Sequence, residues 1–139
     1  MSQYQRILTA VDDSAQRERV LATTAEFAAL TGASVHVLHV DADAPGFDTD
    51  SDSEVSGAAS RLVADAVQAL QARGVRADGG IAHAADVDID DVVLLTARDL
   101  DVQLIVLGAN HRHGVRSWLE ASVADEVAHR AEAPVLLVP

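Results

Sequence analysis

Residues 104–138 contain a complete strand–helix–strand unit: Leu104-Ile-Val-Leu107, a polar loop from Gly108 to Trp118, a helical stretch from Ser122 to Arg130, and Val135-Leu-Leu-Val138. Both apolar runs are typical of strands that are buried on two faces. Two such strands joined through a helix indicate neighbouring parallel strands, because a crossover of this kind returns the chain in the same direction. The unit therefore predicts a parallel sheet with helices on both faces.

The rest of the chain repeats this alternation. Further strands are predicted at 7–11, 35–40 and 75–83, where Gly79 and Gly80 suggest a bulge. The first helix is expected to begin at an N-cap, Ser14, and to stop at Gly32. The sequence therefore predicts a doubly wound α/β fold with five parallel strands.

Two more helices are predicted between these strands. One begins at a capping box formed by Ser51 and Glu54 and runs to Gly74, and another opens near Asp88. In the last helix, 122–130, Asp125 and Glu126 are expected in the first turn, where carboxylates suit the helix dipole. We expect a single domain over residues 1–139, with 41–53 as one acidic, flexible loop.

Composition excludes several classes of function. The chain has 139 residues, no cysteine, no lysine and a formal charge of -12. These counts argue against thiolate or Cys-ligated zinc chemistry, against a P-loop NTPase and against nucleic acid as a partner. No apolar run is long enough to span a membrane, so we expect a cytoplasmic protein with no membrane insertion. The acidic surface favours adaptation to high salt over a general effect on solubility.

The first strand ends in Val11-Asp12-Asp13-Ser14, which contains no glycine. A dinucleotide-binding turn needs glycines here so that the backbone can approach a pyrophosphate, which makes a classical nicotinamide or flavin enzyme a poor fit. Adjacent carboxylates also occur in phospho-acceptor receiver domains, but those domains rely on a lysine that this chain lacks. Ligands of doubly wound folds bind where the strand order reverses.

The stretch from Gly108 to Val123 resembles the phosphate-binding element Gly-x-x-Gly-x9-Gly-Ser/Thr of the universal stress protein family. The resemblance extends to Ile7-Leu-Thr-Ala-Val-Asp-Asp-Ser and to the ending Ala133-Pro-Val-Leu-Leu-Val. It implies a Rossmann-like sheet related to adenine nucleotide alpha hydrolases, with strand order 3-2-1-4-5. It also implies a stress-response module that senses or holds ATP or another adenine nucleotide, with magnesium bound only together with the nucleotide.

The resemblance also assigns positions. Asp12 matches the acidic residue that contacts adenosine, and Val40 matches the position whose backbone faces adenine. Two motif glycines are replaced, by His111 and Ala121, and a Cβ at either place can keep the backbone away from phosphate. The candidate nucleotide-binding residues are Asp12, Val40, Gly108, His111, Arg112, Gly114, Ala121, Ser122 and Val123.

Other chemistry is weakly supported. His111 and His113, with Asp12 and Asp41, could be interpreted as a metal site, but two loop histidines fix no geometry and a solvated loop is favoured. Ser122 lacks the elbow motif of a hydrolase nucleophile. We therefore predict no metal site, no catalytic residue and no enzymatic activity.

The primary hypothesis is a nucleotide-binding homodimer whose cleft lies between the first and fourth strands. In the family that the chain resembles, the C-terminal strand commonly pairs across a two-fold axis, and the run Pro134-Val-Leu-Leu-Val-Pro139 suits such an edge. A monomer whose prolines blunt the edge is the alternative. Two other functions stay open: a nucleotide-free dimer that regulates a protein partner, and a slow phosphohydrolase that uses Asp12, magnesium and ATP.

Overall fold

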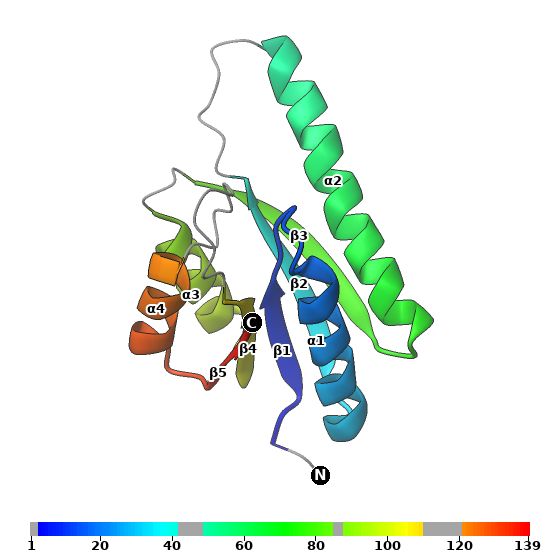
Figure 1. The fold of residues 1–139 in the computed structure, drawn as a ribbon, viewed down its shortest axis with the longest axis vertical. Coiled ribbons are helices and arrows are strands. Elements are labelled where there is room, and N and C mark those ends of the chain that lie inside the picture. The colour runs from blue at the N-terminus through cyan, green and yellow to red at the C-terminus, as the bar shows by residue number, and fades with distance from the viewer. Residues whose placement is uncertain (1–2, 42–48, 85–87, 110–120) are drawn as a thin grey trace.

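The computed structural model describes residues 3–41, 49–84, 88–109 and 121–139 (Figure 1). Within these residues a five-stranded parallel sheet has the order β3-β2-β1-β4-β5. The strands are β1 (Arg6–Ala10), β2 (Ser34–Asp41), β3 (Ala77–His83), β4 (Leu104–Gly108) and β5 (Val135–Val138). The helices are α1 (Arg17–Thr31), α2 (Thr49–Ala72), α3 (Ile89–Asp99) and α4 (Ala121–Arg130). The expected fold class and strand order are confirmed.

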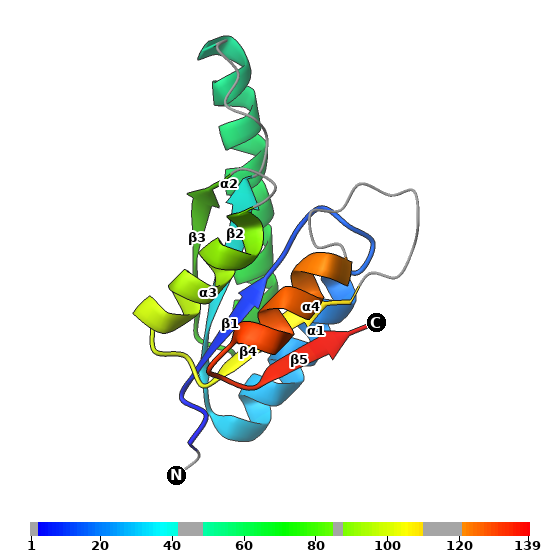
Figure 2. The same cartoon turned by 90° about the vertical axis from the view of Figure 1, so that its left-hand side faces the viewer.

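Helices cover the sheet on both faces. The helices α1 and α2 lie on one face, and α3 and α4 lie on the other, as the two views together show (Figures 1 and 2). Alternation along each strand divides the core: Ile7 packs on the α1 side, whereas its neighbour Leu8 packs on the α3 side. In β4, Ile105 and Val106 divide in the same way. Near-continuous apolar strands therefore fill two cores at once.

Two predicted helix starts are wrong. Ser14 does not cap α1, because the helix begins at Arg17 and Gln16 occupies its N-cap position. The Ser14 backbone N–H instead donates to Asp12 Oδ1 at 3.0 Å, and the Ser14 carbonyl accepts from Arg17 N at 3.2 Å. These two bonds form a turn, so the helix begins further along the chain than the sequence predicts. Gly32 does end α1, with a φ of 74° that glycine adopts without strain.

The second helix starts earlier than its capping box. α2 begins at Thr49, so Ser51 lies inside the helix and is not a cap. The expected acidic loop is shorter at both ends, because Asp41 belongs to β2 and 49–53 belong to α2; residues 42–48 lie outside the described ones. Carboxylates close to a helix start interact favourably with its dipole, which permits an acidic first turn.

Two further expectations are wrong. The register of β2 and β3 runs without interruption from Val35↔Ala77 to Asp41↔His83, so there is no bulge at Gly79 or Gly80. Since α4 begins at Ala121, its first turn holds no acidic residue, and Asp125 and Glu126 follow later in the helix.

None of the helices in the described ranges has the length and apolar character that a membrane span requires.

Candidate functional site

The order of the strands reverses between β1 and β4, and the carboxyl ends of these two strands lie side by side. Asp12 lies two residues beyond the end of β1 and is buried, with 3% of its surface exposed. Its Oδ1 accepts the Ser14 N–H, so the carboxylate is held by its own turn. A buried carboxylate at such a position is a suitable acceptor for a ligand's hydroxyl or amine group.

Val40 lies close by in β2 and is fully buried. The registered pairs of β1 and β2 end at Ala10↔Leu38, and Val11 N donates to the Leu38 carbonyl at 2.9 Å. Because backbone groups alternate between the two sides of a strand, the N–H and C=O of Val40 face the same side as those of Leu38. The Val40 backbone is thus directed toward the side on which β1 has already ended.

Gly108 ends β4 and is buried among residues of the core. A Cβ built on Gly108 would lie 3.2 Å from Gln16 Oε1 and 3.3 Å from Val20 Cγ2. The missing side chain of this glycine therefore faces α1, where the space is already filled. Sequence comparison with the motif assigns Gly108 to phosphate, and the structure adds a packing reason for the same glycine.

Gln16 is a residue of this region that sequence reasoning missed. Its Nε2 donates to the Ala109 carbonyl at 2.6 Å, which joins the start of α1 to the end of β4. A glutamine just before a helix is common and carries no periodic signal, so only the tertiary contact reveals it.

The other predicted residues fall into two groups. Ala121, Ser122 and Val123 form the start of α4, and Val123 packs against the α3 side of the core. His111, Arg112 and Gly114 lie outside the described residues, as does His113. The structure thus brings Asp12, Gly108 and the carboxyl end of β2 to one edge of the sheet. The helix α4 is the next element after β4 in the chain.

A hollow of about 350 Å³ opens beside this edge, between α1 and α2. His39 and Asp41 of β2 line it, and the ring of His39 donates from Nδ1 to the Val11 carbonyl at 2.9 Å. Asp41 Oδ2 lies 3.8 Å from His83 Nδ1. Within the part of the chain that the structure describes, no group of three or more His, Asp or Glu side chains is arranged to hold a metal ion.

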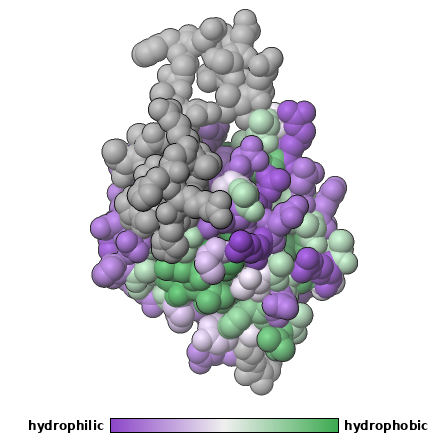
Figure 3. Space-filling view, in the orientation of Figure 1, coloured by the Kyte–Doolittle hydropathy of each residue, from purple (hydrophilic) through white to green (hydrophobic). Residues whose placement is uncertain are grey.

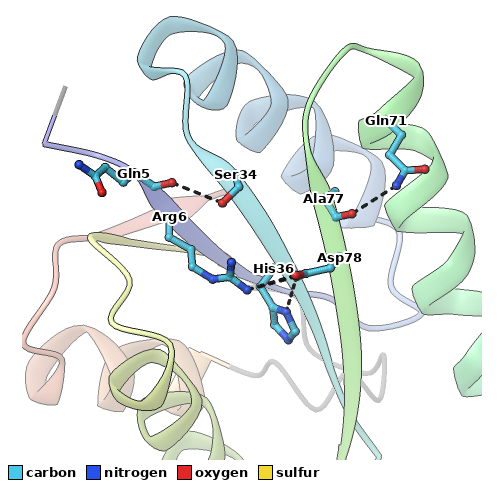
Figure 4. A network of polar contacts seen from close by, with 7 residues as sticks. All are labelled: Gln5, Arg6, Ser34, His36, Gln71, Ala77 and Asp78. Carbon is cyan, nitrogen blue, oxygen red and sulfur yellow. Dashed lines mark hydrogen bonds and ion pairs between the residues drawn. The ribbon is translucent and has the colours of Figure 1, made fainter. Parts of the chain in front are cut away.

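The opposite end of the sheet carries a different polar cluster (Figure 4). Asp78 of β3 accepts a 2.6 Å hydrogen bond from His36 Nδ1 and forms an ion pair with Arg6 at 3.3 Å. Burial acts to raise the pKa of Asp78, but the hydrogen bond and charge of His36, together with Arg6, hold it below the ordinary value.

A hollow of about 590 Å³ also lies away from the strands' carboxyl ends, between the α3–β4 and α4–β5 connections. Neither feature borders Asp12.

The sequence model of the universal stress protein family matches residues 3–139. No curated protein is significantly similar in sequence. A protein of this family from Burkholderia pseudomallei has a similar structure: the TM-score is 0.78, the identity is 27%, and the match covers 100% of this chain and 98% of that one.

Two more solved structures are similar. The universal stress protein from Archaeoglobus fulgidus, solved in complex with dAMP, is 28% identical with a TM-score of 0.74, and the match covers 98% of each chain. A universal stress protein solved in complex with cAMP is 20% identical with a TM-score of 0.75. That match covers 99% of this chain and 98% of the other, and at this identity it supports the fold alone.

Proposed function

This chain belongs to the universal stress protein family, and we propose that it is a cytoplasmic, non-catalytic module that binds an adenine nucleotide in the cleft between β1 and β4. One observation carries the proposal: the buried Asp12 carboxylate lies at the point where the strand order reverses, which is where ligands of doubly wound folds bind. The Archaeoglobus fulgidus relative, 28% identical, was solved with dAMP, which supports adenine as the base.

In this proposal each side of the cleft has a separate task. Asp12 accepts a hydrogen bond from the nucleoside, and the Val40 backbone faces the base. The phosphates lie near the start of α4 at Ala121 and Ser122, where backbone N–H groups and the helix dipole favour negative charge. Magnesium enters only with the phosphates, because it prefers their oxygens to a cage made of protein ligands.

Isothermal titration with dAMP and ATP tests the proposal. Asp12→Asn should weaken binding roughly tenfold or more, since a hydrogen bond to a charged group is worth about 1.5–3 kcal/mol. Asp13→Asn is the matched control: it changes the charge equally, but the Asp13 side chain is 93% exposed, so affinity should stay the same. Equal losses in both variants would show that net charge, rather than Asp12, governs binding. The absence of any binding heat at millimolar nucleotide would overturn the proposal.

The absence of catalysis is part of the proposal. Incubation with ATP and magnesium or manganese should release no phosphate above the buffer rate. Turnover that Asp12→Asn abolishes would establish the phosphohydrolase alternative instead.

We further propose that β5 pairs with the β5 of a second copy. β5 is an edge of the sheet, and Figure 3 shows hydrophobic residues gathered over the β4–β5 side of the molecule. Ile105 N and Ala109 N donate to the carbonyls of Pro134 and Val138, so alternation leaves the N–H of Leu137 on the outer edge. An exposed apolar edge of this kind favours pairing with another strand.

Leu137→Pro tests the dimer without cutting the bond to β4. Proline removes only the outward N–H and is tolerated at sheet edges. Sedimentation should show a dimer for the wild type and a monomer for the variant, whereas Leu136→Pro should destabilise the sheet itself. A wild-type monomer would overturn the pairing.

A second candidate function is favoured by the residues that replace the motif glycines, His111 and Ala121. If their side chains close the phosphate site, the same dimer would act as a nucleotide-free regulator of a protein partner. Absence of binding to ATP and dAMP, together with an intact dimer, would favour this alternative.

A further inference from the structure

Gln16 connects two segments that are far apart in the sequence. It occupies the N-cap position of α1, yet its side chain makes no capping hydrogen bond to the helix. Its Nε2 instead donates to the Ala109 carbonyl, just beyond β4, at 2.6 Å, and the bond is partly buried. A side-chain amide that caps nothing locally and reaches another loop is available to fix that loop.

Ala109 is held from two directions. Its N–H donates to the Val138 carbonyl of β5 at 2.7 Å, and its carbonyl accepts from Gln16. Ala109 is the first residue after β4, so these two bonds determine where the chain leaves the sheet on its way to α4. The N–H and C=O of this one residue are thereby committed to the edge strand and to α1.

Gly108 makes room for this contact. A Cβ at this position would lie 3.2 Å from Gln16 Oε1, a distance tighter than ordinary van der Waals contact. Gln16 also lies in the connection between β1 and α1 that contains Asp12, so it belongs to the same turn as the buried carboxylate. The turn after β1 and the exit from β4 are therefore joined by the hydrogen bond of Gln16.

We propose, on the basis of the nucleotide-binding function proposed above, that Gln16 is a positioning residue of the cleft. It sets the distance between the turn that carries Asp12 and the chain that leaves β4 toward the phosphate side. A ligand that bridges both segments then meets a cleft whose two sides are already in place, and less of its binding energy is spent on ordering them.

Gln16→Met tests this role, because methionine keeps the length of the side chain and its packing on Gly108 but has no donor. The matched control is Gln71→Met. Gln71 Nε2 also donates to a backbone carbonyl, that of Ala77 at 3.2 Å, at the other end of the sheet (Figure 4). Titration with dAMP should give a dissociation constant roughly three- to tenfold higher for Gln16→Met, the effect of one lost hydrogen bond, and an unchanged one for Gln71→Met.

Urea unfolding separates positioning from stability. If Gln16 were merely structural, Gln16→Met would lower the unfolding midpoint and leave the dAMP affinity of the folded protein unchanged, the outcome expected for Gln71→Met; that result would overturn the inference. A wild type that binds neither dAMP nor ATP would overturn the proposed function itself, and this inference with it. Binding by the wild type with equal affinity in Gln16→Met would overturn the inference alone.

A measurement on the wild type covers the case in which Gln16→Met does not fold. The side-chain NH2 resonances of Gln16 and Gln71 are followed by NMR during titration with dAMP. The Gln16 resonances should shift as the cleft fills, and those of Gln71 should stay in place. Stationary Gln16 resonances at saturation would overturn the proposal.

Discussion

Gly79→Ala should destabilise the protein more than any other single added methyl group in β3. A Cβ on Gly79 would lie 2.5 Å from Val63 Cγ1, 3.0 Å from Val67 Cγ2 and 3.1 Å from the Val37 carbonyl oxygen. Carbon atoms normally approach to about 3.5–4.0 Å, so α2 and β3 must move apart. We expect a loss of about 2–3 kcal/mol, near the upper end for an overpacked core, and roughly 6–12 °C in Tm.

Gly80→Ala is the matched control on the next residue of the same strand. Its Cβ would lie 3.5 Å from His36 Nε2 and 3.6 Å from His36 Cε1, which are ordinary contacts. The chemical change is identical, and alanine also reduces the entropy of the unfolded chain, so stability should change by about 0.5 kcal/mol or less.

Urea unfolding followed by circular dichroism measures both variants, with equal slopes required for the comparison. Val63→Ala combined with Gly79→Ala should recover part of the loss, because it removes the atom in the closest contact, and the two changes should be non-additive. If Gly79→Ala proves as stable as Gly80→Ala, the close approach of α2 to β3 is not what requires the glycine.

Three other predictions follow from charges and from the loop. Asp78→Asn should cost roughly 0.5 kcal/mol at neutral pH, since the Asp78 side chain is 61% exposed. The pKa of Asp78 is lowered in the folded protein, so this contribution is present above the ordinary Asp value and should vanish as the pH falls through the lowered one; a difference in urea midpoint that persists in acid would contradict it. His111→Gly combined with Ala121→Gly should strengthen ATP binding in calorimetry, because the change restores the two glycines of the motif and removes Cβ atoms that can keep a backbone away from phosphate; unchanged affinity would mean that the pocket lies elsewhere. The unfolding midpoint should rise from dilute to molar salt, where repulsion is screened over ~3 Å; a flat trend would argue against salt adaptation.

The sheet could be predicted because its signal is repeated. The strands β1, β4 and β5 are short apolar runs between helical stripes, whereas β3 is more polar, and the strand at 135–138 is confirmed at both ends. Errors of a residue or two at the other ends matter little, since burial on both faces is decided by the centre of each run. The parallel order then follows from a fold whose crossovers are helices.

Local turn chemistry was harder to predict, because one residue can serve two structures. Ser14 is a residue type that commonly caps helices, but here its N–H donates to the Asp12 side chain and forms a turn instead. Gly79 and Gly80 fit a bulge in sequence, yet the register is continuous and only Gly79 lies under α2. The first choice depends on which of two local hydrogen bonds forms, and the second on a helix that packs against the strand from elsewhere in the chain; the residue pattern shows neither.

The residues of the site also divide into those that the sequence could predict and one that it could not. Asp12 and Gly108 could be found because each lies at or just beyond the end of a strand, and the carboxyl ends of neighbouring parallel strands must meet. Gln16 could not, because its partner, Ala109, is 93 residues away. The contact also changes the meaning of the motif's first glycine: a family pattern attributes it to phosphate, whereas here the space that it leaves is occupied by α1. Packing on α1 alone can thus require a glycine at this position where the other two glycines of the family's motif are replaced, and its presence alone is no measure of nucleotide binding.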